Sequence, residues 1–114
     1  MSAGRAGEGL AAHLVDLLGP LGSVGSSRFF GGYALRVGGV QFAMVIDGIA
    51  YLRADETLAA ELESLGSSAF RYQTRRREVK VGAYWAIPDE ALDDADQLVE
   101  WARRALRAAR NASE

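Results

Sequence analysis

The chain has 114 residues, no cysteine and a formal net charge of −2. This length is typical of one domain with a single hydrophobic core, and the lack of cysteine excludes disulfides and thiolate metal sites. Residues 1–9 lack the apolar segment of a secretory signal, and the longest apolar run, residues 42–46, is too short to span a membrane. We therefore expect a cytoplasmic protein with no membrane contact, in which residues 1–114 form one domain and residues 1–7 are disordered.

Residues 10–18 have the spacing of an amphipathic helix. Leucines recur at positions i, i+4, i+7 and i+8 from Leu10, which places them on one face of a helix. A Gly–Pro pair at residues 19–20 ends this helix. Residues 21–32 are rich in glycine and serine, and they predict a flexible loop leading into the first strand.

Residues 33–52 predict a three-stranded meander. Gly–Gly at residues 38–39 and Asp–Gly at residues 47–48 favour two-residue hairpin turns. With these turns Leu35 lies opposite Phe42, and the alternation of side chains along each strand assigns one face to the core. That predicted core face consists of Tyr33, Leu35, Val37, Val40, Phe42, Met44, Ile46, Ile49 and Tyr51.

The opposite face of the meander is small and of mixed polarity. We expect it to be covered partly by a helix or by a second subunit. Pairing of this face across a two-fold axis predicts a homodimer. The residues that would pair are Ala43, Val45, Ala50 and Leu52.

Two more helices and a hairpin complete the prediction. Residues 55–65 predict a helix with Asp55 as N-cap, and residues 70–74 and 78–87 predict two strands joined at an arginine-rich tip. Asp94 followed by Gln97 resembles a capping box and starts a last helix.

The order helix, three strands, helix, two strands, helix predicts an α+β fold. Its two layers are an antiparallel sheet, made of a three-strand meander plus a hairpin, and three main helices. No repeated βαβ unit is present, so we do not expect a Rossmann fold.

Residues suited to catalysis or metal binding are sparse. The single histidine, His13, lies off the apolar face of its predicted helix, and the carboxylates fall in helix N-terminal turns, where capping explains them. The Gly31–Gly32 pair lacks the context of a phosphate-binding loop and is best explained by a close turn of the backbone before the first strand. We expect no enzymatic activity, no cofactor and no metal.

The sharpest surface feature is the run Arg75, Arg76 and Arg77, with Arg71 and Lys80 nearby. One interpretation is a hairpin tip that contacts phosphates of a nucleic acid, and the other is a charged turn that keeps a strand edge from aggregating.

Four short motifs, in order, resemble the N-terminal domain of the TfoX/Sxy family. They are Arg-Phe-Phe-Gly-Gly-Tyr at residues 28–33, Gly-Val-Gln-Phe-Ala at 39–43, Tyr-Leu-Arg-Ala-Asp at 51–55, and Tyr-Trp-Ala-Ile-Pro at 84–88 followed by Trp-Ala at 101–102. The family more often has Met at the position of Phe29 and Lys at that of Arg53. The resemblance covers residues 10–110 and implies a single-domain member without the second, C-terminal domain of the full-length competence regulators.

The resemblance implies a regulatory role through a protein partner, because the family's regulators are associated with the cyclic-AMP receptor protein at competence promoters. It supplies no catalytic residues. We therefore expect a protein-interaction module, a transcription or competence co-regulator. The alternatives are direct nucleic-acid binding through the tip at residues 75–77, and small-molecule binding or an enzymatic role near residues 21–32, involving Arg28, Tyr33 and Tyr84. The predicted interaction residues are Arg28, Phe29, Gly31, Gly32, Tyr33, Arg71, Arg75, Arg76, Arg77 and Lys80.

Overall fold

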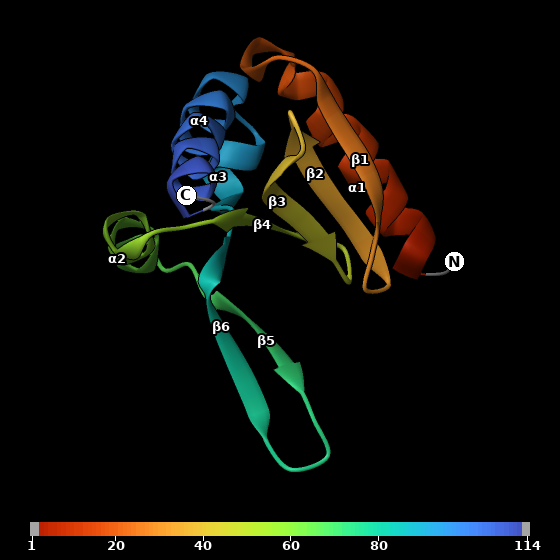
Figure 1. Cartoon of the computed structure of the whole chain (residues 1–114), viewed down its shortest axis with the longest axis vertical. Helices are drawn as coiled ribbons and strands as arrows, with labels where there is room; N and C mark the ends of the chain where they lie inside the picture. The colour runs from red at the N-terminus through yellow and green to blue at the C-terminus, as the bar shows by residue number, and fades with distance from the viewer. Residues whose placement is uncertain (1–2, 113–114) are drawn as a thin grey trace.

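A six-stranded antiparallel sheet carries helices on one face in the computed structural model, which describes residues 3–112, with side chains from residue 7 onward (Figure 1). The strand order is β1-β2-β3-β4-β6-β5, and the predicted α+β class is confirmed. The strands are β1 (Val24–Phe29), β2 (Gly32–Val37), β3 (Val40–Ile46), β4 (Ile49–Arg53), β5 (Ala69–Gln73) and β6 (Glu78–Ala86). The helices are α1 (Ala3–Leu17), the short 3-10 helix η1 (Gly19–Leu21), α2 (Glu56–Ser64), α3 (Asp89–Leu92) and α4 (Ala95–Ala112).

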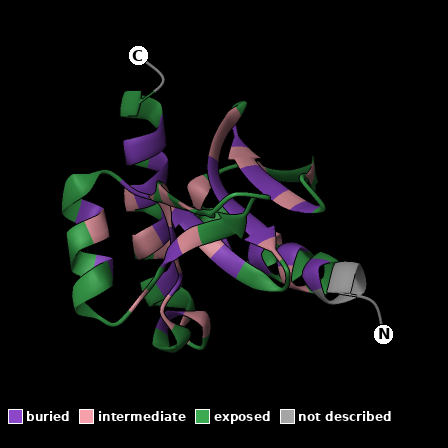
Figure 2. Cartoon of the chain, turned by 90° about the horizontal axis from the view of Figure 1, so that it is seen from below, coloured by how far each residue is buried: buried purple, intermediate pink, exposed green. Residues whose placement is uncertain are grey.

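Helices α1 and α4 cover the sheet on the same side and bury the core. Leu14 and Leu18 from the first helix region and Leu98 from α4 are fully buried against the strand residue Phe42 and its neighbours. Figure 2 shows the buried residues gathered where the helices and strands meet in the interior. None of the helices described over residues 3–112 combines the length and the hydropathy needed to cross a lipid bilayer.

The predicted loop over residues 21–32 is wrong, because residues 24–29 form strand β1. Glycine and serine are poor strand formers, yet β1 is an edge strand that pairs with β2 along its whole length, from Val24 opposite Val37 to Phe29 opposite Gly32. Strand β2 therefore provides the backbone hydrogen bonds that hold β1 in the sheet. An edge strand that is mostly exposed does not need the apolar alternation on which the prediction relied.

The predicted core face is half wrong, and an extra residue in β3 is the reason. Leu35 pairs with Ala43 and Arg36 pairs with Gln41, so Phe42 is left without a partner as a β-bulge. A shift of one residue moves every later side chain to the other face. Ala43, Val45, Ala50 and Leu52 therefore join the core, whereas Met44, Ile46, Ile49 and Tyr51 lie on the face away from the helices.

The helix ends follow the predicted capping chemistry. The backbone N–H of Leu58 donates to the Asp55 carboxylate at 2.8 Å, which confirms the N-cap of α2. At the start of α4 the Asp94 carboxylate accepts from the backbone N–H groups of Asp96 and Gln97 and from the Gln97 side chain. The hydrogen bonds from Gln97 lower the pKa of Asp94.

The first helix begins earlier than predicted. Helix α1 starts at Ala3, so residues 3–7, expected to be disordered, are helical, and residues 1–2 of that prediction lie outside the described residues. The short helix α3 (Asp89–Leu92) also had no predicted counterpart.

Gly32 lets β2 pass very close to β3. A Cβ atom built at this position would lie 2.0 Å from the Val45 carbonyl oxygen, far inside van der Waals contact. We therefore expect Gly32→Ala to lower the free energy of unfolding by about 1–3 kcal/mol through overpacking. Urea denaturation followed by circular dichroism measures this.

The matched control for this prediction is Gly25→Ala on the neighbouring strand β1, where an added Cβ meets no atom within 4 Å. This substitution is expected to change the free energy of unfolding by less than about 0.5 kcal/mol. Equal effects of the two substitutions would show that the close approach of Gly32 to Val45 is not a constraint on the fold.

Candidate functional site

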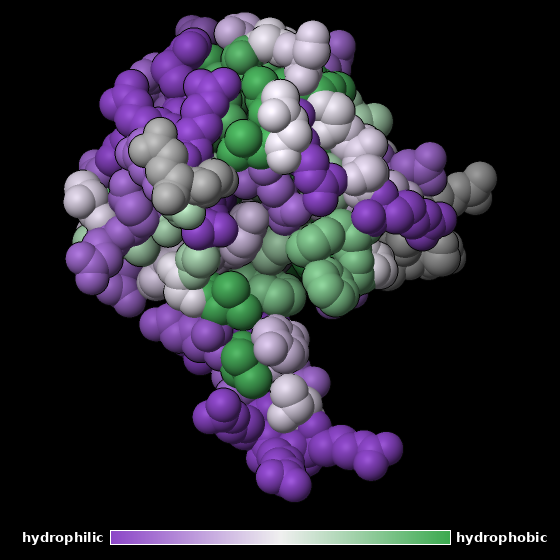
Figure 3. Space-filling model, viewed as in Figure 1, coloured by the Kyte–Doolittle hydropathy of each residue, from purple (hydrophilic) through white to green (hydrophobic). Residues whose placement is uncertain are grey.

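The sheet face away from the helices carries a hollow of about 720 Å³. Phe29 and Phe30 line one side, Met44 and Ile46 of β3 form its floor, and the β5–β6 hairpin forms the other side. Every residue that lines it belongs to a strand or a hairpin turn. Figure 3 shows hydrophobic side chains gathered at the base of the projecting hairpin, with a hydrophilic hairpin end beyond them.

Aromatic rings fix the shape of this hollow. Tyr51 and Phe70 meet edge to face with their ring centroids 5.2 Å apart, and Phe70 lies 6.1 Å from Tyr72 further along β5. Phe29 and Phe30 make a second edge-to-face pair at 4.7 Å. Such pairs add stability beyond area burial and hold the rings in defined orientations. Burial and, to a lesser extent, the negative charge of Asp47 raise the pKa of the Tyr51 hydroxyl.

Phe30 is the most exposed of the large hydrophobic residues that line the hollow. Its side chain is 86% exposed and its φ angle is +47°. It shares a two-residue hairpin turn with Gly31, whose φ is also positive, as in the turns at residues 38–39 and 47–48. Those two turns start with Gly38 and Asp47, which tolerate this left-handed conformation, whereas an aromatic residue there is strained.

Strain and exposure together at Phe30 suggest selection for something other than stability. A residue held in an unfavourable backbone region is a reason to look for a function, and an exposed aromatic ring beside an apolar hollow is typical of a binding anchor. A turn that starts with Phe-Gly where Asn-Gly or Asp-Gly is favoured is also a signal readable in the sequence. Phe30 was absent from our predicted interaction residues.

The predicted residues of the first motif divide between the two faces of the sheet. Phe29 lines the hollow. Arg28 and Tyr33 pair across β1 and β2 on the helix-covered side, with the Arg28 guanidinium 5.8 Å from the Tyr33 ring centre. Gly31 has a φ of +76°, and Gly32 passes under the Val45 carbonyl. The two glycines thus have the backbone role that the sequence indicated.

Only one of the three polar residues predicted for the alternative small-molecule site near residues 21–32 lines the hollow. A hollow does lie beside Phe29 and Phe30, and Tyr84 lines it. Arg28 and Tyr33 lie on the opposite side of the sheet and are absent from that lining. The three polar groups proposed for such a site therefore do not converge.

The basic residues among the predicted interaction residues, apart from Arg28, all lie on the β5–β6 hairpin. Arg71 is at the edge of the hollow and forms an exposed ion pair with Glu78 at 3.3 Å. The ammonium of Lys80 lies 5.4 Å from the Trp85 ring centre. Arg75, Arg76 and Arg77 form the exposed turn between the two strands, away from the hollow.

The surface predicted for homodimer pairing is not available. Ala43, Val45, Ala50 and Leu52 are each at most 4% exposed and belong to the core under α1 and α4. The bulge at Phe42 is the physical reason, because it turns these side chains toward the helices. A homodimer stays a prediction and would need another surface.

The same bulge places Met44 and Ile46 in the hollow instead of in the core. The alternation of side chains alone does not predict this position.

Among the described residues, no group of three or more histidine, cysteine or acidic side chains is arranged to hold a metal ion. The arrangement is suited to contact with an apolar surface.

The family profile described as the TfoX N-terminal domain matches residues 16–109. The chain belongs to the TfoX N-terminal domain family. The match to the TfoX N-terminal domain runs from within α1 to near the end of α4, so it includes both sides of the hollow and the arginine tip. No curated protein matches the sequence at a significant level.

We predict that replacing Phe30 in this TfoX N-terminal domain by asparagine will stabilise it. Asn-Gly suits a turn with two positive φ angles, and a left-handed conformation costs about 1–2 kcal/mol for an ordinary residue. Since the lost contact with Phe29 is exposed, we expect the free energy of unfolding to rise by about 0.5–1 kcal/mol. Chemical denaturation of the two proteins measures the difference.

Asp47→Asn is the control at the equivalent position of another turn, where φ is +52°. It should change stability by less than about 0.5 kcal/mol, since aspartate already tolerates this conformation. If Phe30→Asn instead destabilised the protein by more than about 1 kcal/mol, packing rather than function would explain the phenylalanine.

Proposed function

We propose that this TfoX N-terminal domain is a regulatory module that binds a protein partner through the apolar hollow. Membership of the family supports a regulatory role in general terms. The observation that carries the proposal is the exposed, strained Phe30 beside an apolar hollow that no described helix lines. A role as a transcription or competence co-regulator in the cytoplasm is the finer form of this proposal.

The composition of the hollow favours a protein partner. Aromatic residues, methionine and arginine are enriched in protein–protein interfaces, and a few of them in packed pockets supply most of the binding energy. Here Phe30 and Tyr72 are exposed on opposite sides, Met44 is on the floor, and Arg71 and Asp47 lie among the lining residues. The partner should therefore present an apolar segment with polar groups at its margin.

The hollow is also more than one side chain wide. It is bounded by the β1–β2 turn and by the β5–β6 hairpin, which belong to opposite edges of the sheet. A partner segment placed between them would cover Phe30 and Tyr72 together. Burying apolar surface contributes roughly 25 cal/mol per Å², so covering both rings provides a physical reason for binding.

Site-specific photo-crosslinking in the native host tests the docking surface. A benzoylphenylalanine at position 72 should form an adduct of discrete mass with another protein, because the side chain there is half-exposed and lines the hollow. The same group at position 65 is the control, since Leu65 is also exposed but lies at the end of α2, outside the hollow. Mass spectrometry identifies the adducts.

Identical adducts at positions 72 and 65, or none at position 72, would contradict docking in the hollow. An adduct between two copies of the chain would mean that the partner in the hollow is a second copy and not a different protein. Adding Phe30→Asn to the position-72 protein should remove most of the specific adduct, because one wall of the hollow is then lost.

A chromosomal Phe30→Asn allele tests the regulatory role. We expect it to change the same transcripts as a deletion of the gene, because the folded protein would no longer hold its partner. Leu65→Asn is the matched allele at an exposed apolar residue away from the hollow, and its transcript profile should resemble the wild type. A deletion that leaves all transcript levels unchanged would sink the regulatory proposal.

A further inference from the structure

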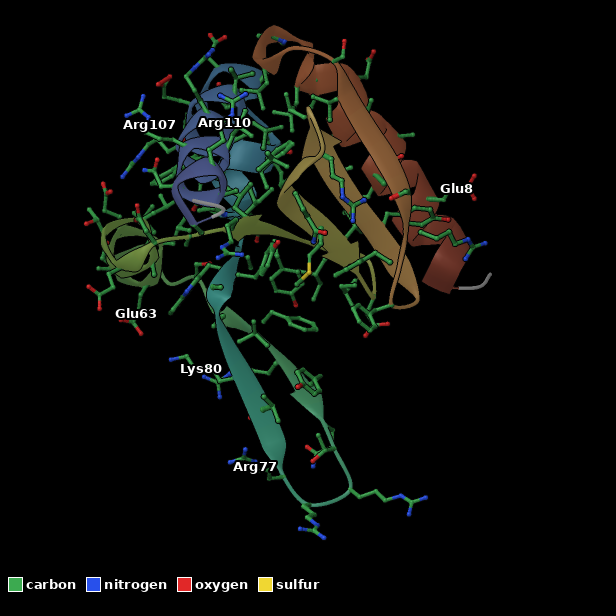
Figure 4. The ribbon with its side chains drawn as sticks, viewed as in Figure 1. Glu8, Glu63, Arg77, Lys80, Arg107 and Arg110 are labelled. Carbon is green, nitrogen blue, oxygen red and sulfur yellow. The ribbon has the colours of Figure 1, made fainter. Side chains whose placement is uncertain are left out.

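The tip of the β5–β6 hairpin has an ordered backbone and exposed arginines. The backbone N–H of Thr74 donates to the Arg77 carbonyl at 2.9 Å, closing the turn. The Thr74 hydroxyl oxygen accepts from the backbone N–H groups of Arg76 and Arg77 at 3.3 and 3.1 Å. These bonds hold the backbone of the turn while the arginine side chains extend into solvent, as Figure 4 shows for Arg77.

Positive charge on this hairpin is not balanced locally. Residues 71–80 carry five basic side chains and one acidic one, whereas the whole chain has a net charge of −2, so the rest of the chain is net negative. Glu78 pairs with Arg71. Among residues 3–112, no ion pair involves Arg75, Arg76 or Arg77.

The hairpin carries the arginines away from the acidic body (Figure 1). Strand β4 pairs with β6 only at Tyr84, Trp85 and Ala86, so residues 78–82 extend beyond the rest of the sheet. At about 3.3 Å per residue this segment is roughly 15 Å long. That exceeds the Debye length of about 8 Å at physiological salt, so repulsion between the body and a polyanion held at the tip is largely screened.

We propose that this tip binds the phosphate backbone of duplex DNA without regard to base sequence. A two-stranded ribbon fits a major groove about 12 Å wide, and the permanently charged guanidinium groups attract phosphate oxygens. The tip offers three such groups at successive positions on a pinned turn. An acidic protein surface could also attract arginines, but a narrow ribbon that projects ahead of the body is better suited to a groove than to a flat surface.

The proposal is independent of the partner in the hollow, because the tip and the hollow use different residues. A DNA contact at the tip together with a protein contact in the hollow would let one small domain touch both at a promoter. Only a few phosphates would be involved, so the binding should be weak, and its salt dependence should be shallower than that of a protein with many phosphate contacts.

Fluorescence anisotropy with a labelled duplex of about 20 base pairs tests this. If the tip neutralises three phosphates, the slope of log K against log salt is about −2.7, and affinity falls about 40-fold between about 50 and about 200 mM NaCl. The variant Arg75→Gln, Arg76→Gln, Arg77→Gln should bind at least about tenfold more weakly at the lower salt and lose most of this slope.

The control variant is Arg103→Gln, Arg107→Gln, Arg110→Gln, which removes the same charge from exposed positions on α4. Figure 4 shows Arg107 and Arg110 far from the hairpin tip. The affinity of the control variant should stay within about threefold of wild type, and so should that of a tip variant with three lysines, because either residue neutralises phosphates. Circular dichroism confirms that each variant is folded. Phe30→Asn should leave DNA affinity unchanged, which separates failure of this proposal from failure of the hollow.

Four outcomes would overturn the proposal. The first is no binding of the wild type up to about 10⁻⁴ M at the lower salt, and the second is an equal loss of DNA affinity in the tip and α4 variants. The third is binding to poly-glutamate that is as tight as binding to the duplex. The fourth is an affinity that differs more than about tenfold between two duplexes of unrelated sequence. The third outcome would assign the tip to an acidic binding partner.

Discussion

One inserted residue in β3 determines which side chains of β3 and β4 face the core. Because Phe42 has no partner in β2, the side chains before and after it change phase, and Phe42 and Ala43 both join the core. From that point the residues facing the helices alternate between the small Ala43 and Ala50 and the larger Val45 and Leu52. The small side chains Ala43 and Ala50 allow the helix layer to approach closely, while Met44, Ile46 and Tyr51 are left on the open face.

The sheet face away from the helices combines stabilising aromatic contacts with a strained, exposed residue, Phe30. Ring contacts connect Tyr51, Phe70 and Tyr72, edge to face between Tyr51 and Phe70 and tilted between Phe70 and Tyr72. The same surface keeps Phe30 exposed in a left-handed turn. Stability alone would favour a polar or glycine residue there, as at the other two turns. Binding sites commonly keep such strain where activity needs it, so the cost at Phe30 is understandable if a partner covers the ring.

Local chemistry in the sequence predicts most of this fold, and long-range register limits the rest. Both predicted turns, the N-cap Asp55 and the arginine hairpin follow from residue types at fixed spacings, and the structure confirms them. Strand β1 escaped prediction because pairing with a neighbour, not its own composition, stabilises it. The hollow escaped because alternation assumes an unbroken ladder, and nothing near Phe42 in the sequence indicates an insertion.

The hairpin and the hollow depend on the same irregularity at the base of β6. Ala69 pairs with Trp85, but the next residue, Phe70, pairs with Val81, so residues 82–84 form an insertion in β6. This lets the indole N–H of Trp85 donate to the Gly82 carbonyl while the ring stays in the core, and the ribbon beyond it leaves the sheet. The strand that projects the arginines is thereby anchored by a buried tryptophan. Changes at the tip should consequently leave the core intact, whereas the direction of the ribbon, and with it one wall of the hollow, is determined at Trp85.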